Sequence, residues 1–598
     1  MNDTITGRLD AVRQAMREQG IDALMVPRAD EYLGEYLPER NERLRWLSGF
    51  SGSAGLAVVL PAAAAIFVDG RYTVQVRQEV RAELYEYRQL PEEVPTTWLL
   101  ERLEPGARVG YDPRLHTDAW RSSTEATLTR AGLQLCPLED NPIDACWHGR
   151  PTAPVRPALL LGEEFSGRPS MEKRRELAAT LGTQGVDAAL VFAADSVAWL
   201  LNLRGYDVPH LPLVLAHALL HADSSLELFV DPRKIPAGFA AHAGEGVHVL
   251  SEAGLDAALA RLAGKRVLFD PETSSAWCRL RLDAHEATAV QAADPVLLPK
   301  ACKNAVEIAG MRAAHRRDAV AMVHFLAWLD AEIEAGHLHD EALLANRLHA
   351  LRASGEHFHD LSFDTISAAG ENAALCHYRH SEDTPGKLAL GSVYLVDSGA
   401  QYLDGTTDIT RTIAIGEPSH EIRHLATLAM KGHIALACAR FPEGTSGGQL
   451  DVLARQFLWQ QGFDYDHGTG HGVGCFLSVH EGPQRIGKAA NAVALRPGMV
   501  LSNEPGYYRE HGFGIRHENL MLVTAPTVPP AGERPMHGFE ALTLVPFDRR
   551  VLEPLLLSDQ EIAWLDAYHL QVRDALSPLL EGSELRWLER MTRPIGAA

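Results

Sequence analysis

The sequence predicts an α/β protein with two related N-terminal α/β domains followed by a larger C-terminal α+β domain. Its 598 residues are enough for several domains, each with a sizeable core. In the N-terminal half, residues 19–24 (QGIDAL) recur as residues 184–189 (QGVDAA), and residues 66–71 (IFVDGR) recur as residues 228–233 (LFVDPR). Both repeats are offset by about 160 residues, which indicates two copies of one domain of that size.

Each copy is expected to begin with a helix that leads into a short buried strand. Residues 8–19 and 171–184 have the charged, amphipathic pattern of such helices, and short apolar runs follow them. This alternation favours layers of helices packed on a sheet.

Two segments mark the expected domain boundaries. Residues 150–157 (RPTAPVRP) have the proline-rich composition of a linker. A second boundary is expected near residues 300–304, before a long helical pattern. We therefore predict domains at residues 1–155, 156–302 and 303–598.

The composition argues against several classes of partner. A formal net charge of −22 is unfavourable for binding nucleic acid, which requires a basic face. The longest apolar run, residues 54–68, is interrupted by Gly55 and Pro61 and is too short to span a bilayer. The charged first residues do not have the pattern of an export signal, and seven irregularly spaced cysteines do not indicate a disulfide framework. We expect a cytoplasmic protein that binds neither nucleic acid nor membrane.

Five possible metal ligands stand in order in the C-terminal domain, each in its own local motif. They are Asp397 in VYLVDSG, Asp408 in GTTDITRT, His471 in HGTGHGVG, Glu504 in LSNEPGYY and Glu518 in GIRHENLMLV. Four carboxylates and one imidazole form an oxygen-rich set that suits Mn²⁺ or another hard to borderline divalent ion. Two bridging carboxylates would hold two metal ions with a shared water, which is hydrolase chemistry.

The spacing of the carboxylates predicts two hairpins folded around one site. Residues 393–396 form an apolar strand that leads to Asp397, and residues 408–415 alternate as a returning strand. In the same way, residues 499–501 lead to Glu504, and residues 515–523 return carrying Glu518. Two such units indicate an internal duplication.

The segment around His471 combines alternating glycines with additional histidines. Glycines at positions 468, 470, 472 and 474 are costly inside regular structure and indicate close backbone approach. His467 and His480 lie within 14 residues of sequence that include His471. A single histidine of this kind is usually an ordinary polar surface residue, so only the neighbouring ligand motif favours a functional role.

These five motifs, in this order, closely resemble those of the pita-bread metallopeptidases. The three-domain aminopeptidase P family is the most similar branch, because residues 48–55 (SGFSGSAG), 68–75 (VDGRYTVQ) and 307–321 (EIAGMRAAHRRDAVA) also resemble it. The resemblance implies two creatinase-like N-terminal domains and a pita-bread catalytic domain with a C-terminal helical extension. The start of that helical extension is indicated by a capping box at residues 558–561.

The resemblance also implies a role for each ligand and an activity. Asp397 would chelate one metal ion, Asp408 and Glu518 would bridge both, and His471 and Glu504 would bind the other. The implied activity is that of an Xaa-Pro aminopeptidase, which releases the first residue from peptides with proline in second position.

Further residues are implied around the reacting bond. His377, His467 and His480 would line the substrate site, with His380 as a rival for the role of His377. Catalysis would involve His377, His480 and Glu504, the last handling the proton of the nucleophile. Arg411 and Arg516 would orient carboxylates.

Several points stay open at this stage. His517 stands where relatives commonly have an aliphatic residue, and we expect it to face away from the metal ions if Glu518 lies on a strand. Trp459 is either a core residue or part of a homodimer interface of the catalytic domain. Alternatives to the aminopeptidase are a prolidase that cleaves dipeptides, a creatinase-like hydrolase and a non-catalytic binding module.

Overall fold

The computed structural model describes residues 4–489 and 491–595, which form two compact units. The first unit contains the residues up to 162 together with residues 168–297. The second unit contains residues 163–167 and the chain from residue 298 onward.

The first unit contains two sheets with the same strand order. In the described part of the chain these are six-stranded sheets, β4-β3-β2-β1-β5-β6 and β12-β11-β10-β8-β13-β14. In the first, β1 pairs antiparallel with β2 and parallel with β5, and β8 pairs with β10 and β13 in the same way in the second. The predicted internal repeat is therefore a repeat of topology. The strands are β1 (Ala23–Pro27), β2 (Leu56–Val59), β3 (Ala64–Val68), β4 (Glu86–Gln89), β5 (Arg108–Tyr111), β6 (Gln134–Pro137), β8 (Ala188–Val191), β10 (His217–His221), β11 (Leu226–Phe229), β12 (Val247–Leu250), β13 (Arg266–Phe269) and β14 (Thr288–Gln291).

Helices cover the sheets of this unit because the strands are apolar on both faces. Along β1, Leu24 and Val26 face one core cluster while Ala23 and Met25 face another, as the two-residue period of a strand requires. The repeated helices begin where expected, although their bounds differ by a few residues. They are α1 (Ile5–Gln19) and α8 (Ser170–Thr183), with α5 (Asp118–Arg130) and α12 (Ala276–Ala284) later in each copy.

The second unit is an α+β domain whose sheets carry the predicted site. Antiparallel strands form the sheets β16-β17-β20 and β22-β21-β23-β26-β27, and β24 pairs with β25. Their bounds are β16 (Ile366–Ala369), β17 (Ser392–Ser398), β20 (Ile409–Ile415), β21 (Gly470–Gly472), β22 (Glu481–Ile486), β23 (Val500–Asn503), β24 (Gly506–Arg509), β25 (Phe513–Arg516), β26 (Asn519–Val523) and β27 (Phe539–Ala541).

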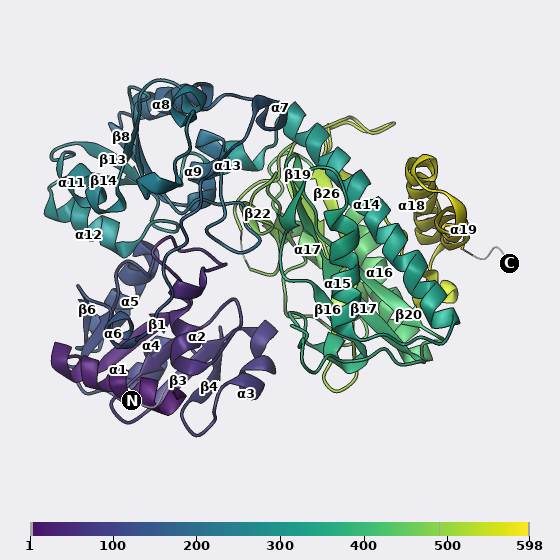
Figure 1. The fold of residues 1–598 in the computed structure, drawn as a ribbon, viewed down its shortest axis with the longest axis horizontal. Helices are drawn as coiled ribbons and strands as arrows, with labels where there is room; N and C mark the ends of the chain where they lie inside the picture. Colours follow the sequence, from purple (N-terminus) through teal and green to yellow (C-terminus); the bar gives the residue numbers. More distant parts are fainter. Residues whose placement is uncertain (1–3, 490, 596–598) are drawn as a thin grey trace. The chain divides into compact units, whose positions relative to one another are not determined.

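Long helices pack against these strands around one large core. Met322 and Leu326 of α14 (Ala305–Glu334) and Leu344 of α15 (Glu341–Ala353) share this core with Val396 of β17 and Ile413 of β20. Figure 1 shows α14, α15 and α16 (His420–Ala437) beside these strands. The core thus fixes the backs of the strands whose other side chains build the site.

The C-terminal helices belong to the same core. Helix α18 (Asp559–Leu576) begins at the predicted capping box, in which the side chains of Ser558 and Glu561 each bond to the other's backbone N–H. Helix α19 (Gly582–Met591) follows, and both contribute to the core, for example through Leu565 and Trp587.

No helix among the described residues is long and apolar enough to span a membrane. The seven cysteines all lie in the described part of the chain, and none of them forms a disulfide.

Candidate metal centre

The five predicted ligands occupy strands or strand ends in the second unit. Asp397 lies in β17, Asp408 directly precedes β20, and His471 lies in β21. Glu504 lies between β23 and β24, and Glu518 lies between β25 and β26.

The second hairpin differs from the continuous strands that the sequence predicts. Its pairing runs from Val500 to Asn503 against β26 and resumes at Gly506 against β25. Both partners are therefore interrupted at the same level, and the expected strand 515–523 is broken at the ligand position. This shared break releases Glu504 and Glu518 from the ladder together, so that their side chains can turn toward one site.

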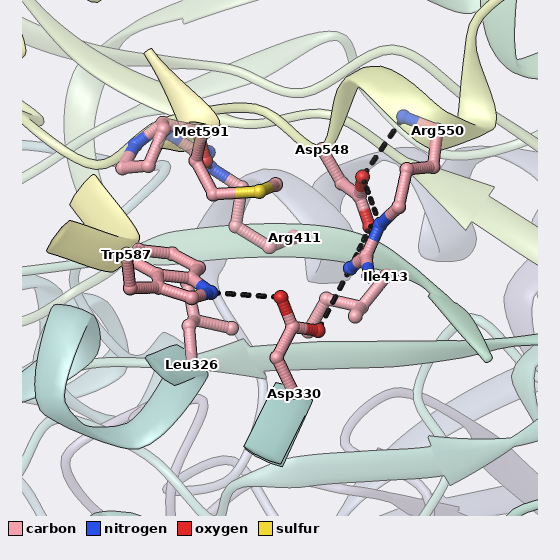
Figure 2. Close-up of a pocket in the computed structure, with 9 residues that line it drawn as sticks. Leu326, Asp330, Arg411, Ile413, Asp548, Arg550, Trp587 and Met591 are labelled. Atoms are coloured by element: carbon pink, nitrogen blue, oxygen red, sulfur yellow. Dashed lines mark hydrogen bonds and ion pairs between the residues drawn. The ribbon is translucent and has the colours of Figure 1, made fainter. Parts of the chain in front are cut away.

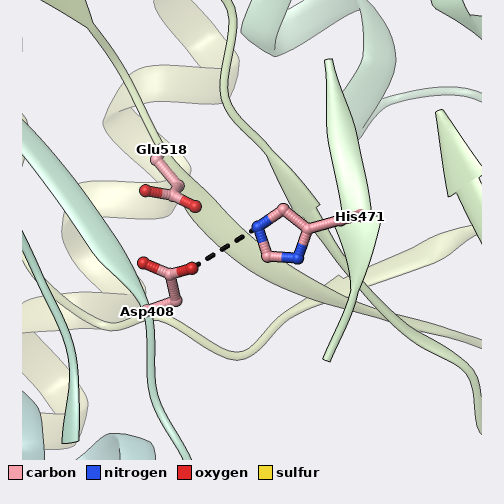
Figure 3. Close-up of side chains that lie close together, drawn as sticks. All are labelled: Asp408, His471 and Glu518. Atoms are coloured by element: carbon pink, nitrogen blue, oxygen red, sulfur yellow. Dashed lines mark ion pairs between the residues drawn. The ribbon is translucent and has the colours of Figure 1, made fainter. Parts of the chain in front are cut away.

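Three of the five side chains converge tightly. Asp408, His471 and Glu518 each offer a ligand atom, and these atoms lie within 4.8 Å of one another (Figure 3). Nε2 of His471 lies 3.5 Å from Oδ2 of Asp408 and 3.5 Å from Oε1 of Glu504. Asp397 adjoins these residues through Arg516, whose Nη2 donates to Oδ2 of Asp397 at 2.5 Å and whose Nε donates to the hydroxyl of Thr410 at 3.1 Å. The same hydroxyl donates to Glu518.

The site is enclosed around Asp408 and Glu518, the two proposed bridging ligands, and is more open at His471. The whole-residue exposure is 4% for Asp408 and 2% for Glu518. The side chains of Glu504 and His471 keep 17% and 22% of their surface. A ligand therefore reaches the cluster from the side of Glu504 and His471.

The carboxylates of this cluster are destabilised by their surroundings. Burial, and then the negative charges of Asp408 and Asp397, raises the pKa of Glu518 well above its ordinary value. Burial also raises the pKa of Asp397 to about 7, against the opposing effect of Arg516, and it raises the pKa of Glu504. Buried carboxylates crowded in this way require positive charge nearby.

The imidazole of His471 responds to the same negative charge. Burial disfavours its charged form, but the hydrogen bond with Asp408 and the charge of Glu504 outweigh burial and raise its pKa to about 9. Its Nδ1 lies 2.9 Å from the carbonyl oxygen of Gly472, which can only accept a hydrogen bond. The Nδ1–H is thereby committed to the backbone, and Nε2 faces the carboxylates, as in histidines that bind metal ions.

The residues present fit divalent cations. Oδ1 of Asp397 and Oδ1 of Asp408 are buried and have no hydrogen-bond partner among the described residues. Buried polar atoms are normally satisfied, so two such oxygens beside an imidazole nitrogen that faces the carboxylates are suited to coordination. The oxygen-rich donor set favours Mg²⁺, Mn²⁺ or a similar ion over a thiolate-binding one.

Glycines are required where β21 passes its neighbours. A Cβ on Gly470 would lie 2.0 Å from the carbonyl oxygen of Ser502, and one on Gly472 would lie 2.3 Å from that of Glu481. The expectation of close backbone approach is confirmed at these two glycines but not at Gly468, where a Cβ would lie no closer than 3.5 Å to a neighbour. Only glycine on both sides of His471 allows this strand to lie between its two neighbours.

His467 is part of an ordered hydrogen-bond chain beside the carboxylates. Its Nδ1 lies 2.8 Å from the carbonyl oxygen of Gly468 and must donate, so Nε2 accepts from the hydroxyl of Tyr508 at 2.8 Å. That hydroxyl in turn accepts from Nη1 of Arg516 at 2.6 Å. Nδ1 of His467 lies 3.9 Å from Glu504, so this predicted substrate residue borders the ligand cluster.

The other predicted histidines are half-buried. The ring of His480 lies 4.3 Å from that of His471, tilted by 68°, and His480 is half-buried. His377 is half-buried in the segment after the short helix Gly370–Ala374. Its rival His380 lies 3.4 Å from Glu382.

The two predicted arginines behave differently. Arg516 contacts a ligand carboxylate, with Nη2 lying 2.5 Å from Oδ2 of Asp397. Arg411 makes no such contact, contrary to the direct contact expected, and instead donates to the main-chain carbonyl oxygen of Glu518. Among the described residues its guanidinium donates to main-chain carbonyls, to the amide oxygen of Asn519 and to the hydroxyl of Tyr568. Neighbouring residues of β20 face opposite sides, so the side chain of Arg411 lies behind the strand.

Several contributing residues escape the sequence patterns. Thr410 donates to Oε2 of Glu518 at 2.7 Å, and Ser502 donates to Oε1 of Glu504 at 3.1 Å. His433 of α16 lies with Nδ1 3.1 Å from the carbonyl oxygen of Asn503 and 3.2 Å from that of His517. His433 therefore binds the main chain directly before both glutamates. Thr410 and Ser502 were within reach of the motifs, but nothing in the sequence of α16 marks His433.

The two residues left open by the sequence are now placed. His517 is buried, and its Nε2 lies 3.1 Å from the carbonyl oxygen of Ala426, facing away from the carboxylates. Trp459 of α17 (Gly447–Trp459) is 44% exposed, so the interpretation as a core residue is wrong.

Family models match almost the whole chain. The Creatinase/Prolidase N-terminal domain matches residues 8–145 and again 149–307. Metallopeptidase family M24 matches residues 309–525, and the C-terminal region of peptidase M24 matches residues 535–595.

Individual proteins match along the full chain as well. A probable Xaa-Pro aminopeptidase P of Aspergillus fumigatus is 39% identical, over 99% of this chain and 93% of the relative. The crystal structure of an X-prolyl aminopeptidase from Caenorhabditis elegans, described as a cytosolic enzyme with a di-nuclear active site, superimposes with a TM-score of 0.95. It is 34% identical, over 99% of this chain and 100% of that one. An Xaa-Pro dipeptidase from Bacillus anthracis shares the fold at 24% identity and a TM-score of 0.51, covering 63% of this chain and 99% of its own. The chain belongs to metallopeptidase family M24 and, within it, to the three-domain Xaa-Pro aminopeptidases P.

Proposed function

We propose that this chain is a metal-dependent Xaa-Pro aminopeptidase that releases the first residue of peptides with proline in second position. The observation that carries the proposal is the convergence of all five family ligand positions in a chain similar to X-prolyl aminopeptidases over its full length. A module that only binds other proteins would be expected to have lost some of these ligands, whereas all five are present here.

Two divalent ions are proposed at this site, held by Asp397, Asp408, His471, Glu504 and Glu518. Manganese is the first candidate because the donors are four carboxylates and one imidazole. When bound, such a pair supplies Lewis acidity and a water that is acidic enough to lose a proton near neutral pH.

Glu504 is proposed to accept the proton of the attacking water. It is the more exposed glutamate of the site, and its raised pKa suits a group that takes up a proton during the reaction. Ser502 donates to its Oε1 and so fixes the orientation of the carboxylate.

The histidines are proposed to act on the substrate. His480 stands beside His471 with a half-exposed ring and can donate to the carbonyl oxygen as negative charge develops on it. The prolyl nitrogen carries no hydrogen in the peptide and must gain a proton to leave, for which His377 or His480 is the donor. His467, ordered by Gly468 and Tyr508, would line the substrate pocket without transferring a proton.

A prolidase is the nearest alternative. The dipeptidase fold covers only 63% of this chain, whereas the aminopeptidase relatives include both N-terminal domains. An additional N-terminal domain is better suited to a site for longer peptides than to one for dipeptides, which supports the aminopeptidase.

Two finer proposals concern assembly and location. A homodimer through the catalytic domain is supported by Trp459 and Val452, which are 44% and 45% exposed on α17. A cytoplasmic location is supported by the cytosolic relative from C. elegans and by the absence of disulfides among the seven cysteines, all of which are described.

The test is a paired assay on enzyme stripped with a chelator and then restored with Mn²⁺. We expect release of the first residue from an Xaa-Pro-Xaa tripeptide, dependent on the added metal, and little turnover of the matching Xaa-Pro dipeptide. Turnover of the dipeptide alone would identify a prolidase. If metal binds but neither peptide is cleaved, the proposed substrate class is wrong.

A further inference from the structure

Arg411 is a buried cation that forms no ion pair among the described residues, although the charge of Glu518 partly offsets its burial. It is 1% exposed, and burial lowers its pKa. Its guanidinium donates to the carbonyl oxygens of Thr410, Glu518, Val545 and Pro546. A guanidinium presents five N–H donors in a rigid planar fork, so it can hold several carbonyl groups at fixed positions.

One side of this fork reaches the metal-ligand strand. Nη1 donates to the carbonyl oxygen of Glu518, and Nη2 lies 2.9 Å from Oδ1 of Asn519. The arginine thus holds the main chain at the start of β26, where the carboxylate of Glu518 turns toward the site.

The same guanidinium is bound by the C-terminal region, residues 535–595. Nη2 donates to the carbonyl oxygen of Val545 at 2.6 Å and to the hydroxyl of Tyr568 in α18 at 3.2 Å. The guanidinium carbon lies 4.0 Å from the ring centroid of Phe547, within range for a cation–π contact. This region therefore supplies both hydrogen-bond partners and an aromatic surface.

The same aromatic surface supports the second main-chain anchor. Phe547 lies 5.1 Å from the ring of His433, which binds the carbonyl groups before Glu504 and Glu518. Trp564 lies 5.9 Å from His433 and stacks on Tyr568 at 5.5 Å. We call Phe547, Trp564 and Tyr568 the aromatic floor.

A separate set of contacts fastens the C-terminal region to the unit. Trp587 donates to Asp330 of α14 at 2.7 Å, and Arg550 pairs with both Asp330 and Asp548 (Figure 2). Asp548 also accepts from the backbone N–H of Ala414. These contacts line a small cavity that Arg411 also borders, but they do not touch the main chain of Glu504 or Glu518.

We infer that the C-terminal region is a positioning element for the metal centre. Its aromatic floor holds Arg411 and His433, and these two residues hold the strand break from which Glu504 and Glu518 reach the metal ions. The inference rests on the metal site of the proposed function. It assigns to the region a role in metal affinity that is separate from its contribution to stability.

The test compares two matched variants of the full chain. Tyr568→Phe removes one hydroxyl from the floor, and Trp587→Phe removes one indole N–H from the fastening contacts. Metal-free protein is titrated with Mn²⁺ by calorimetry, and its unfolding temperature is measured in parallel. Loss of a direct hydrogen-bond partner of a ligand weakens metal affinity by about 10- to 100-fold. Tyr568 acts one contact further out, through Arg411, so Tyr568→Phe is expected to weaken Mn²⁺ affinity by up to about 10-fold. Trp587→Phe is expected to bind Mn²⁺ like the wild type, although both variants unfold at a lower temperature.

A third variant keeps the inference testable if Tyr568→Phe has a small effect. Phe547→Leu retains an apolar side chain but removes the ring beneath Arg411 and His433, so it too should weaken Mn²⁺ binding. Wild-type affinity in both floor variants, or equal losses in the floor variants and Trp587→Phe, would overturn the inference. If the wild type itself binds no Mn²⁺, the proposed metal site fails and this inference fails with it.

Discussion

The carboxylate of Glu518 is strongly destabilised by its surroundings in the metal centre. It is 2% exposed, and burial together with the neighbouring Asp408 and Asp397 raises its pKa well above the ordinary range. One hydrogen bond, from Thr410, opposes this effect. The charged carboxylate therefore lowers the stability of the metal-free fold, and bound cations would remove this cost.

Replacing this carboxylate tests that conclusion directly. Glu518→Gln keeps the shape and the hydrogen bond from Thr410 but removes the charge. We expect Mn²⁺ stoichiometry to fall from two toward one, and activity to fall by more than the roughly 100-fold caused by losing an outer partner. The metal-free variant should unfold at a temperature no lower than the metal-free wild type, because a destabilised buried carboxylate has been removed.

Glu540→Gln provides the control for Glu518→Gln. Glu540 pairs with Arg312 at a partly exposed position of the same unit, so losing its charge should change neither metal binding nor turnover. Full turnover by Glu518→Gln with two bound Mn²⁺ ions would remove Glu518 from the ligand set.

Among the elements, helix α17 has the closest connection to the histidine segment. Arg455 is fully buried and donates to the carbonyl oxygens of Tyr465 and His467 at 2.7 and 2.8 Å. It also pairs with Asp451, which accepts from the hydroxyl of Thr469. The buried face of α17 thus fixes the segment that leads into His471.

We expect Arg455→Lys to reduce kcat/KM by about 10- to 100-fold, because a lysine cannot bind both carbonyls and Asp451 and the histidines shift slightly. The measurement is steady-state kinetics on a tripeptide, together with the unfolding temperature. Arg174→Lys is the control, since Arg174 is also buried and donates to carbonyl groups, in the first unit. An equal loss of activity in both variants would show that Arg455 acts through general stability alone.

The elements also show what sequence patterns can and cannot predict. Hydrophobic patterning predicts α14, which buries one face, and the leading strands β17 and β23, whose apolar runs are buried on both faces. The break in the strand around Glu518 was not predicted, because the polar run at residues 516–519 is also compatible with a continuous strand and the interruption depends on contacts from α16, where His433 binds the carbonyl oxygen of His517. The direction of Arg411 escaped prediction for a related reason: strand alternation places it behind β20, but its partners come from residues 545–568.

For the whole molecule, the short repeats predicted the duplicated architecture of the first unit only. Two brief matches in the N-terminal half correspond to two sheets with the same strand order. The residues that position the metal ligands were not predicted. The ligand motifs identify the chemistry, but the positioning residues are scattered along the sequence. His433 and Tyr568 lie far from any motif, and only the folded chain brings them beneath the glutamates.

Buried neutral histidines in both units predict loss of stability in mild acid. Burial lowers the pKa of His116 to about 3 and that of His217 to about 4 in the first unit. In the second unit burial, followed by the charges of Arg549 and Arg411, lowers the pKa of His569 to about 3. The Nε2 of His569 accepts from the backbone N–H of Phe547 at 3.2 Å and so must be unprotonated.

The direction of the pH effect follows from these values. As the pH falls below about 6.5, the unfolded chain protonates these histidines while the folded chain does not, so acid favours unfolding. Each group removes up to about 1.4 kcal/mol of folding free energy per pH unit between 6.5 and its folded pKa. Above pH 7 the groups have no effect.

Urea unfolding of the wild type and His569→Gln between pH 7.5 and 5 isolates one such contribution, because the carboxylates of the metal centre are common to both proteins. We expect the stability difference between the two proteins to narrow as the pH falls, by about 1 kcal/mol per pH unit below 6. A difference that stays constant over this range would mean that His569 is already charged in the folded protein.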